Sequence, residues 1–152
     1  EDLLELYCLH IRSLTEYCST VFHSSLTIRL SNKLEAIQKT CLRVILDIMY
    51  VDYTSALEMC ALSTLHKRRE NRSLSFAIKS TKHKTNSSMF PLNPIQNTHS
   101  VRNHEKFFVN KARTENYRQS TIPHLQRRLN QHIEKLLEVR RKAGKRTPGR
   151  PV

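Results

Sequence analysis

Apolar residues recur every three or four positions along the first half of the chain, which is the spacing of one face of an α-helix. Within residues 1–22 these positions are Leu4, Tyr7, Cys8, Ile11, Leu14, Cys18 and Val21. Four more apolar side chains widen the stripe, namely Leu3, Leu6, Leu9 and Phe22. The pattern therefore predicts one heavily buried helix that ends at the pair Ser24-Ser25.

The same spacing predicts a second helix that ends near Met49. Its apolar face comprises Leu30, Leu34, Ile37, Cys41, Val44, Ile45 and Ile48. Thr27 can cap this helix because a hydroxyl accepts hydrogen bonds from the N–H groups of the first turn, and Ser31 is the alternative start. We expect Thr54 to cap a brief helix and Ser63 to cap a longer one over residues 64–82.

The second half of the chain contains an irregular stretch and then another helical pattern. Pro91 and Pro94 lie in a segment rich in Asn, Ser and His, and Met89 to Leu92 form an apolar stretch that can pack on the bundle. Lys106 to Val109 is expected to be extended. The fold class that we predict is mainly α: a helical bundle at 1–82, a loop-rich strap at 83–120, a long basic C-terminal helix at 121–143 and a disordered basic tail at 144–152.

Charge is distributed very unevenly. Residues 1–63 contain 5 Lys and Arg against 8 Asp and Glu, whereas residues 64–152 contain 21 against 5. A cationic excess of this size attracts polyanions, because neutralised phosphates release their condensed counterions. We therefore expect sequence-independent binding of RNA or DNA.

The candidate nucleic-acid-binding side chains form two groups. The first lies on the predicted helix at 64–82 and comprises Lys67, Arg68, Arg69, Arg72, Lys79 and Lys82. The second lies at the C-terminal end and comprises Arg140, Arg141, Lys142, Lys145, Arg146 and Arg150. The alternative for the first group is a solvated helix face. For the second, a nuclear localisation signal and a partial Gly-Arg-Pro minor-groove hook at Gly149 are the alternatives.

No catalytic, metal or cofactor site is predicted. None of the four cysteines, Cys8, Cys18, Cys41 and Cys60, belongs to a Cys-x-x-Cys pair, so free thiols in a reducing intracellular compartment are expected. Glu16 and His23 are two helical turns apart, and we interpret them as a polar tether rather than an acid–base pair. The apolar runs are too short to cross a bilayer, so no membrane contact is expected.

Four blocks of sequence resemble the region after the palm in reverse transcriptases of non-LTR retrotransposons, the LINE-like and jockey-like elements. The first runs from Ile11 to Thr27. The second, Leu34-Glu35-Ala36-Ile37-Gln38-Lys39 through Arg43 to Ile45, is similar to the family's Leu-Glu-x-x-Gln-Lys-x-x-Leu-Arg helix. The third runs from Ala56 to Lys79 and the fourth from Arg102 to Asn130. Together the blocks cover about residues 3–131 in the family's order.

The resemblance implies the thumb and post-thumb region of an RNA-directed DNA polymerase. In that family the thumb grips the template–primer duplex, and the catalytic aspartates lie upstream in the palm, in a Tyr-x-Asp-Asp motif. That motif is absent, and Asp occurs at positions 2, 47 and 52 alone. The chain begins Glu1-Asp2 rather than with Met, so we interpret it as a fragment that is not an enzyme as it stands.

Two alternatives remain beside this interpretation. The chain could be a helical protein-interaction module whose apolar surfaces meet the missing palm. It could also be a non-functional retroelement remnant, because Phe22 and Leu129 stand where the family has Trp.

Overall fold

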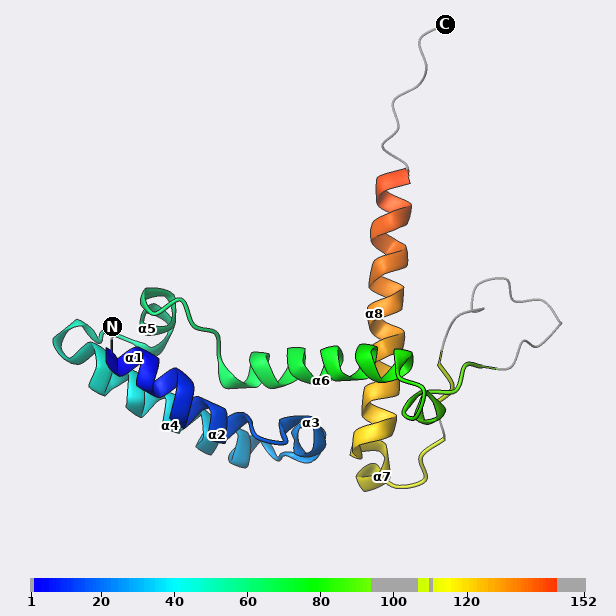
Figure 1. Ribbon diagram of the computed structural model, residues 1–152, viewed down its shortest axis with the longest axis horizontal. Helices are drawn as coiled ribbons and strands as arrows, with labels where there is room; N and C mark the ends of the chain where they lie inside the picture. Colours follow the sequence, from blue (N-terminus) through cyan, green and yellow to red (C-terminus); the bar gives the residue numbers. More distant parts are fainter. Residues whose placement is uncertain (1, 94–106, 110, 145–152) are drawn as a thin grey trace, which may run out of the picture. The chain divides into compact units, whose positions relative to one another are not determined.

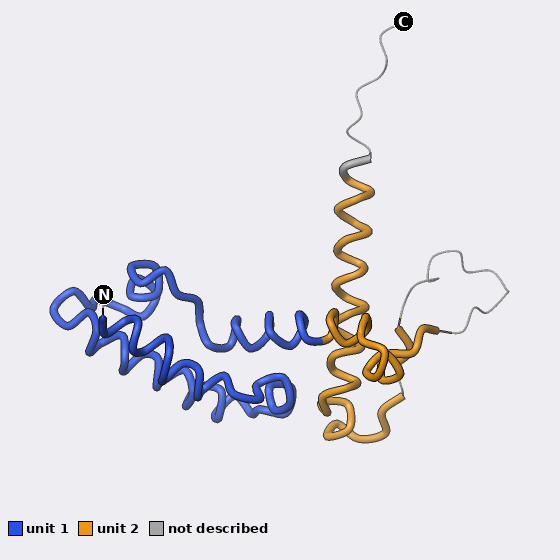
Figure 2. Tube along the Cα trace, in the orientation of Figure 1, with its two compact units in different colours: residues 1–76 blue, residues 77–152 orange. Residues whose placement is uncertain are grey.

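The computed structural model describes residues 2–93, 107–109 and 111–144. The predicted site residues Lys145, Arg146 and Arg150 lie outside the described residues, and so does the predicted tail beyond Gly144. The chain forms two compact units, residues 1–76 and residues 77–152 (Figure 2). The boundary falls inside one continuous helix, so the end of that helix belongs to the second unit.

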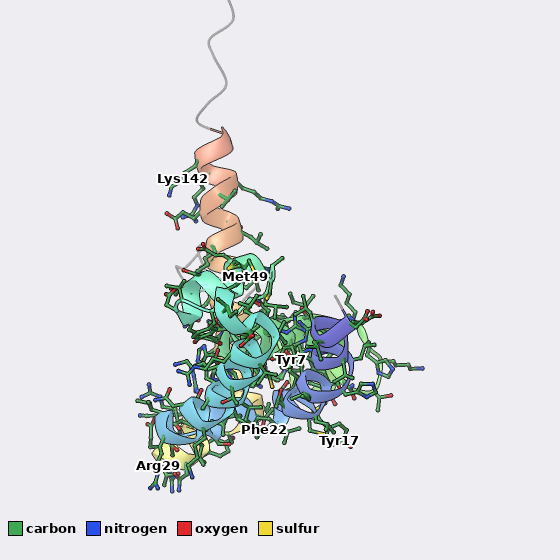
Figure 3. The ribbon with its side chains drawn as sticks, turned by 90° about the vertical axis from the view of Figure 1, so that its left-hand side faces the viewer. Tyr7, Tyr17, Phe22, Arg29, Met49 and Lys142 are labelled. Carbon is green, nitrogen blue, oxygen red and sulfur yellow. The ribbon has the colours of Figure 1, made fainter. Side chains whose placement is uncertain are left out.

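The described residues are helical apart from turns, loops and one isolated bridge, which confirms the predicted mainly α class (Figure 1). In the first unit α1 (Asp2–Leu6), a π-helical turn (Tyr7–Ile11) and α2 (Arg12–Glu16) follow one another directly. This segment runs beside α4 (Ile28–Leu46), and Tyr7 lies buried between the two (Figure 3).

The prediction of one unbroken, heavily buried helix over residues 1–22 is wrong. Helical geometry stops at Tyr17, and Cys18 has the left-handed conformation, with φ of 50°. A short α3 (Ser19–Phe22) and a 3-10 turn (His23–Ser25) follow. Leu3, Leu6 and Leu9 are each more than half exposed, because only one side of the helix meets α4.

Two helices after this break surround the apolar core of the first unit. Thr27 caps α4 as predicted, and its Oγ1 accepts from the Leu30 N–H at 3.3 Å. α4 ends at Leu46, short of the predicted end near Met49, because Asp47 leaves the helical conformation with φ of 45°. A 3-10 turn (Asp47–Met49) and α5 (Tyr53–Met59) follow. The core is centred on Leu42, Ala56 and Leu57, with these partly buried side chains around it: Ile45, Leu46, Tyr50, Tyr53, Cys60 and Leu62.

Two of the predicted helix caps differ from the observed ones by one or two residues. Asp52, not Thr54, caps α5, and its Oδ1 accepts from the Ser55 N–H at 3.1 Å. Thr64, not Ser63, accepts from the Lys67 N–H at 3.2 Å at the start of α6 (Leu65–Lys82). In each case neighbouring residues have side chains that can cap, so composition alone does not decide between them.

The second unit is built around α8 (Thr121–Gly144), close to its predicted bounds. It also contains a 3-10 turn (Ser87–Met89) and α7 (Glu115–Gln119). Phe90 of the predicted apolar stretch is buried and contacts Phe107 edge to face at 6.3 Å between ring centroids, while Leu92 is exposed. Leu92 pairs in an isolated antiparallel bridge with Phe107, which is a described residue of the segment predicted to be extended.

Side-chain amides fasten the loops of the second unit to α8. The Asn130 side chain accepts from the Phe107 N–H at 2.8 Å and donates to the Phe107 carbonyl at 2.9 Å. The Gln126 Nε2 donates to the Met89 carbonyl at 2.9 Å. Both amides therefore satisfy backbone groups of the loops that pack against α8. Within the described residues no helix is long and apolar enough to cross a membrane.

Candidate nucleic-acid interface

The first turn of α6 is attached to α4 by side chains of the second resemblance block. Both carboxylate oxygens of Glu35 accept backbone N–H groups, from Leu65 at 3.1 Å and from His66 at 3.2 Å. The Gln38 Nε2 donates to the Ser63 carbonyl at 3.2 Å. A carboxylate here satisfies N–H groups that have no partner within the helix and complements the helix dipole. Glu35 and Gln38 therefore position α6, and with it the predicted cationic cluster.

Arg68 and Arg72, two members of that cluster, converge on Glu16. Arg68 makes a two-pronged contact in which Nε meets Oε1 and Nη2 meets Oε2 at 3.2 Å. Arg72 Nη2 lies 3.3 Å from the same Oε2, and the Glu16 side chain is 1% exposed. Hydrogen bonding to Glu16 raises the pKa of the Arg68 guanidinium above its ordinary value. A phosphate could engage these two guanidinium groups only in competition with a buried carboxylate.

Arg69 is fully buried, although it stands between two partly exposed neighbours. Its Nη2 donates to the Ser31 Oγ at 3.0 Å, whereas Nε and Nη1 have no hydrogen-bond partner. Burial lowers the pKa of this guanidinium, and the negative charges of Glu35 and Glu16 oppose that effect. The predicted phosphate contact of Arg69 thus falls on a side chain that the surface does not present.

The remaining member of the first half of α6, Lys67, is exposed and lies 3.6 Å from Glu70 one turn away. Such a pair at the surface contributes little to stability and does not hold the lysine in place. Lys67 is therefore the member of this half that a phosphate can reach without breaking a buried contact.

Those sequence-predicted cations of the second unit that the structure describes are exposed. Lys79 and Lys82 are three residues apart, so they lie on the same side of α6. Arg140, Arg141 and Lys142 occupy the last turns of α8. Lys142 lies 2.9 Å from Glu138, while the other four form no ion pair with any described carboxylate. These four side chains can neutralise phosphates without losing an ion-pair partner.

Sequence reasoning missed the residue that decides which cations are available. Glu16 contacts Arg68 and Arg72 rather than His23, whose ring lies edge to face with His66 at 5.3 Å. The sequence did single out Glu16 in one respect, because it is the only acidic residue between Glu5 and Glu35. It lies 52 positions before Arg68, so no local pattern connects the two residues.

Groups of three or more His, Cys, Asp or Glu side chains that could hold a metal ion do not occur in the part of the chain that the structure describes. Comparisons with protein-family models, with curated proteins and with solved structures find no match for this chain.

Proposed function

We propose that this chain is the C-terminal part of a retrotransposon-type RNA-directed DNA polymerase and contacts template–primer nucleic acid through the backbone phosphates. The observation that supports the proposal most directly is the exposure of Lys79, Lys82, Arg140 and Arg141 without a carboxylate partner among the described residues. The four resembling sequence blocks supply the link to the polymerase. In this proposal the chain binds the duplex, and the aspartates that catalyse phosphoryl transfer belong to the palm, which this sequence does not include.

The proposed interface contains fewer cations than the sequence predicts. Arg68, Arg69 and Arg72 stabilise the first unit, because two of them neutralise Glu16 and the third is buried. Phosphate contact is assigned to Lys67, Lys79 and Lys82 and to the end of α8. Contacts to phosphates contribute affinity without selecting a sequence, so the proposed binding is indifferent to base sequence.

A labelled RNA–DNA hybrid tests this function through fluorescence anisotropy at several salt concentrations. If only the four exposed, unpaired cations Lys79, Lys82, Arg140 and Arg141 contact phosphates, the affinity is expected to fall about 100-fold between 50 and 200 mM salt, because each contact releases counterions. Hybrids of scrambled sequence are expected to bind equally well. An affinity that does not change with salt would refute the proposal.

A second candidate function is supported by the apolar surface of the first unit. Leu3, Leu6 and Leu9 are 55%, 53% and 61% exposed, a row along α1 and the π-helical turn. Exposed apolar patches of this kind are typical of protein-binding surfaces. On this view the chain is a helical interaction module, and the row contacts the missing palm.

Sedimentation velocity separates this second candidate from nucleic-acid binding. If the row is an unoccupied interface, the chain is expected to self-associate, and Leu6→Lys is expected to abolish that association. Leu6 is exposed, so the substitution leaves the core intact. A wild-type chain that stays monomeric at high concentration would remove this candidate.

A further inference from the structure

The exposed side of α4 carries an apolar stripe. Leu30, Ile37 and Val44 are 48%, 41% and 67% exposed and follow one another at intervals of seven residues. The half-buried Leu34 and Cys41 lie between them, so the spacings along the stripe alternate between four and three. This alternation is typical of a helix face that packs against another helix. The five residues, which we call the α4 stripe, are therefore suited to a helical partner.

A shallow groove of about 320 Å³ lies along the middle of the α4 stripe. It is lined by α4 alone, through Lys33, Ala36, Ile37, Thr40 and Cys41. Ala36 and Thr40 have small side chains, so they leave a hollow beside Ile37 and Cys41. A leucine side chain of a partner can pack into such a hollow, as a knob enters a hole between two packed helices.

Positive charges lie beside the α4 stripe at its N-terminal end. Arg29 and Lys33 are exposed, and neither forms an ion pair with a described residue. Glu35 is the one acidic residue of α4, and its carboxylate accepts the N–H groups at the start of α6. A second α4 therefore has no carboxylate available for these cations, and repulsion between like charges opposes the pairing of two α4 stripes.

The exposed row on α1 and the π-helical turn has the opposite charge. Asp2 and Glu5 are exposed, and each lies four residues before a leucine of the row. Side chains four residues apart are neighbours on a helix. The first Lys or Arg of the sequence is Arg12, so α1 and the π-helical turn contain neither. The row is therefore apolar and acidic, which makes it complementary to the α4 stripe and its cations.

The row and the α4 stripe also match in length and in the placement of their charges. Leu14 is 77% exposed and extends the row onto α2, so the row is about 16 Å long and the α4 stripe about 21 Å, at 1.5 Å per residue. If the row of one copy runs parallel to the α4 stripe of another, Asp2 and Glu5 come beside Arg29 and Lys33. Within one molecule α1 and α4 run antiparallel (Figure 1), so this match requires two molecules.

We infer that two copies of this chain associate, with the row of one copy packed along the α4 stripe of the other and the two helices parallel. The apolar side chains supply the contact area, and the opposite charges select the partner and its direction. The inference goes beyond the proposed contact with phosphates, and it gives the row of the second candidate function a defined partner. Because single helices meet, the interface is small and the association is expected to be weak.

Exchanged charges test the pairing by sedimentation velocity of the full chain at low salt. Glu5→Lys and Lys33→Glu each bring like charges together, and each is expected to weaken self-association about fivefold. The double variant Glu5→Lys/Lys33→Glu restores opposite charges and is expected to associate within about twofold of wild type. A double variant that associates as weakly as either single variant would overturn the inference.

Two matched controls change the same charges elsewhere on the first unit. Lys39→Glu alters an exposed cation of α4 whose ammonium lies over the Tyr53 ring, away from the α4 stripe. Glu58→Lys alters an exposed carboxylate of α5. Both are expected to leave self-association unchanged. If they weaken it as much as Lys33→Glu and Glu5→Lys do, net charge and not the pairing of these faces controls association, and the inference fails.

Complementation between two variants tests whether two different faces meet. Leu6→Lys alters the row and Ile37→Glu alters the α4 stripe, so each variant alone is expected to stay monomeric. An equimolar mixture is expected to associate, because each variant supplies one intact face. A mixture that stays monomeric would contradict the inference. Circular dichroism checks that each variant folds, and if Ile37→Glu unfolds, the exchanged charges still decide.

Self-association and nucleic-acid binding are measured separately, so each can fail alone. A wild-type chain that stays monomeric up to about 1 mM would overturn the inference, and salt-dependent binding of the RNA–DNA hybrid by that monomer would leave the proposed function intact. The predicted pattern of variants without hybrid binding would support the inference and refute the proposed function. Self-association that Leu6→Lys abolishes and Ile37→Glu leaves unchanged would overturn the inference but not the second candidate function.

Discussion

Glu16 determines which arginines in the first half of α6 are available to a phosphate. Its carboxylate is buried and meets two guanidinium groups, from Arg68 and Arg72. A carboxylate removed from water is stable only when such partners compensate for its lost hydration. These contacts fix the end of α2 against α6. Arg68 and Arg72, which the sequence predicts to bind phosphates, therefore stabilise the first unit instead.

Replacing Glu16 with Gln tests this structural role. Both arginines keep part of their hydration, so the expected loss of unfolding free energy is about 2 kcal/mol, below the range for a fully buried pair. Urea denaturation measures it. Glu5→Gln is the control because Glu5 is exposed on α1, and it is expected to change stability by less than about 0.5 kcal/mol. Equal stability of the two variants would contradict the role of Glu16.

The stability of the first unit depends on pH through the carboxyl group of Asp52. Hydrogen bonds from the Ser55 side chain, the Thr54 side chain and the Ser55 backbone lower the pKa of its carboxyl from 3.8 to about 2. A depressed pKa means that the folded state favours the ionised form, so the contribution to stability is present above pH 4 and is lost as the pH falls towards 2. Unfolding titrations of wild type and Asp52→Asn are expected to differ above pH 4 and to converge near pH 2. A constant difference across that range would exclude this mechanism.

At the scale of elements, Glu35 determines where α6 begins. Its two oxygens accept the Leu65 and His66 N–H groups, and the Tyr53 hydroxyl also donates to it. Burial first, and then the hydrogen bond to Glu35, raises the pKa of that tyrosine above its ordinary value. One carboxylate thus connects α4, α5 and α6.

Glu35→Ala is expected to lower the free energy of unfolding by about 2 kcal/mol, because a cap is lost and two N–H groups are left without an acceptor. Thermal unfolding followed by circular dichroism measures the change. Glu58→Ala serves as the comparison, since Glu58 is exposed on α5. If both substitutions lower the melting temperature by the same amount, Glu35 does not act as a cap between elements.

The helices with a regular apolar spacing could be predicted from the sequence, and the tertiary contacts could not. The bounds of α4, α6 and α8 agree with prediction within a few residues, because spacing and capping residues are local signals. The break at Cys18 carries no Gly or Pro signal, since Cys adopts the left-handed conformation there. The cap from Glu35 and the burial of Arg69 depend on residues about 30 or more positions away, so no window of sequence contains them.

In the molecule as a whole, some cations stabilise the first unit and others are exposed and available to phosphates. Arg68, Arg69 and Arg72 in the first half of α6 neutralise Glu16 or are buried in the first unit, whereas Lys79, Lys82, Arg140, Arg141 and Lys142 of the second unit are exposed. The net charge of +13 therefore overstates the number of side chains that are free to meet phosphates. Affinity for nucleic acid is expected to follow the exposed subset and not the total.

The slope of log affinity against log salt for an RNA–DNA hybrid tests this division most directly. Each lysine that contacts a phosphate adds about one to the slope, so the double variant Lys79→Ala/Lys82→Ala is expected to lower it by about two. Arg69→Met also removes a positive charge, but from a buried side chain, and is expected to leave the slope unchanged. A slope that falls with Arg69→Met and stays constant in the double lysine variant would contradict the account.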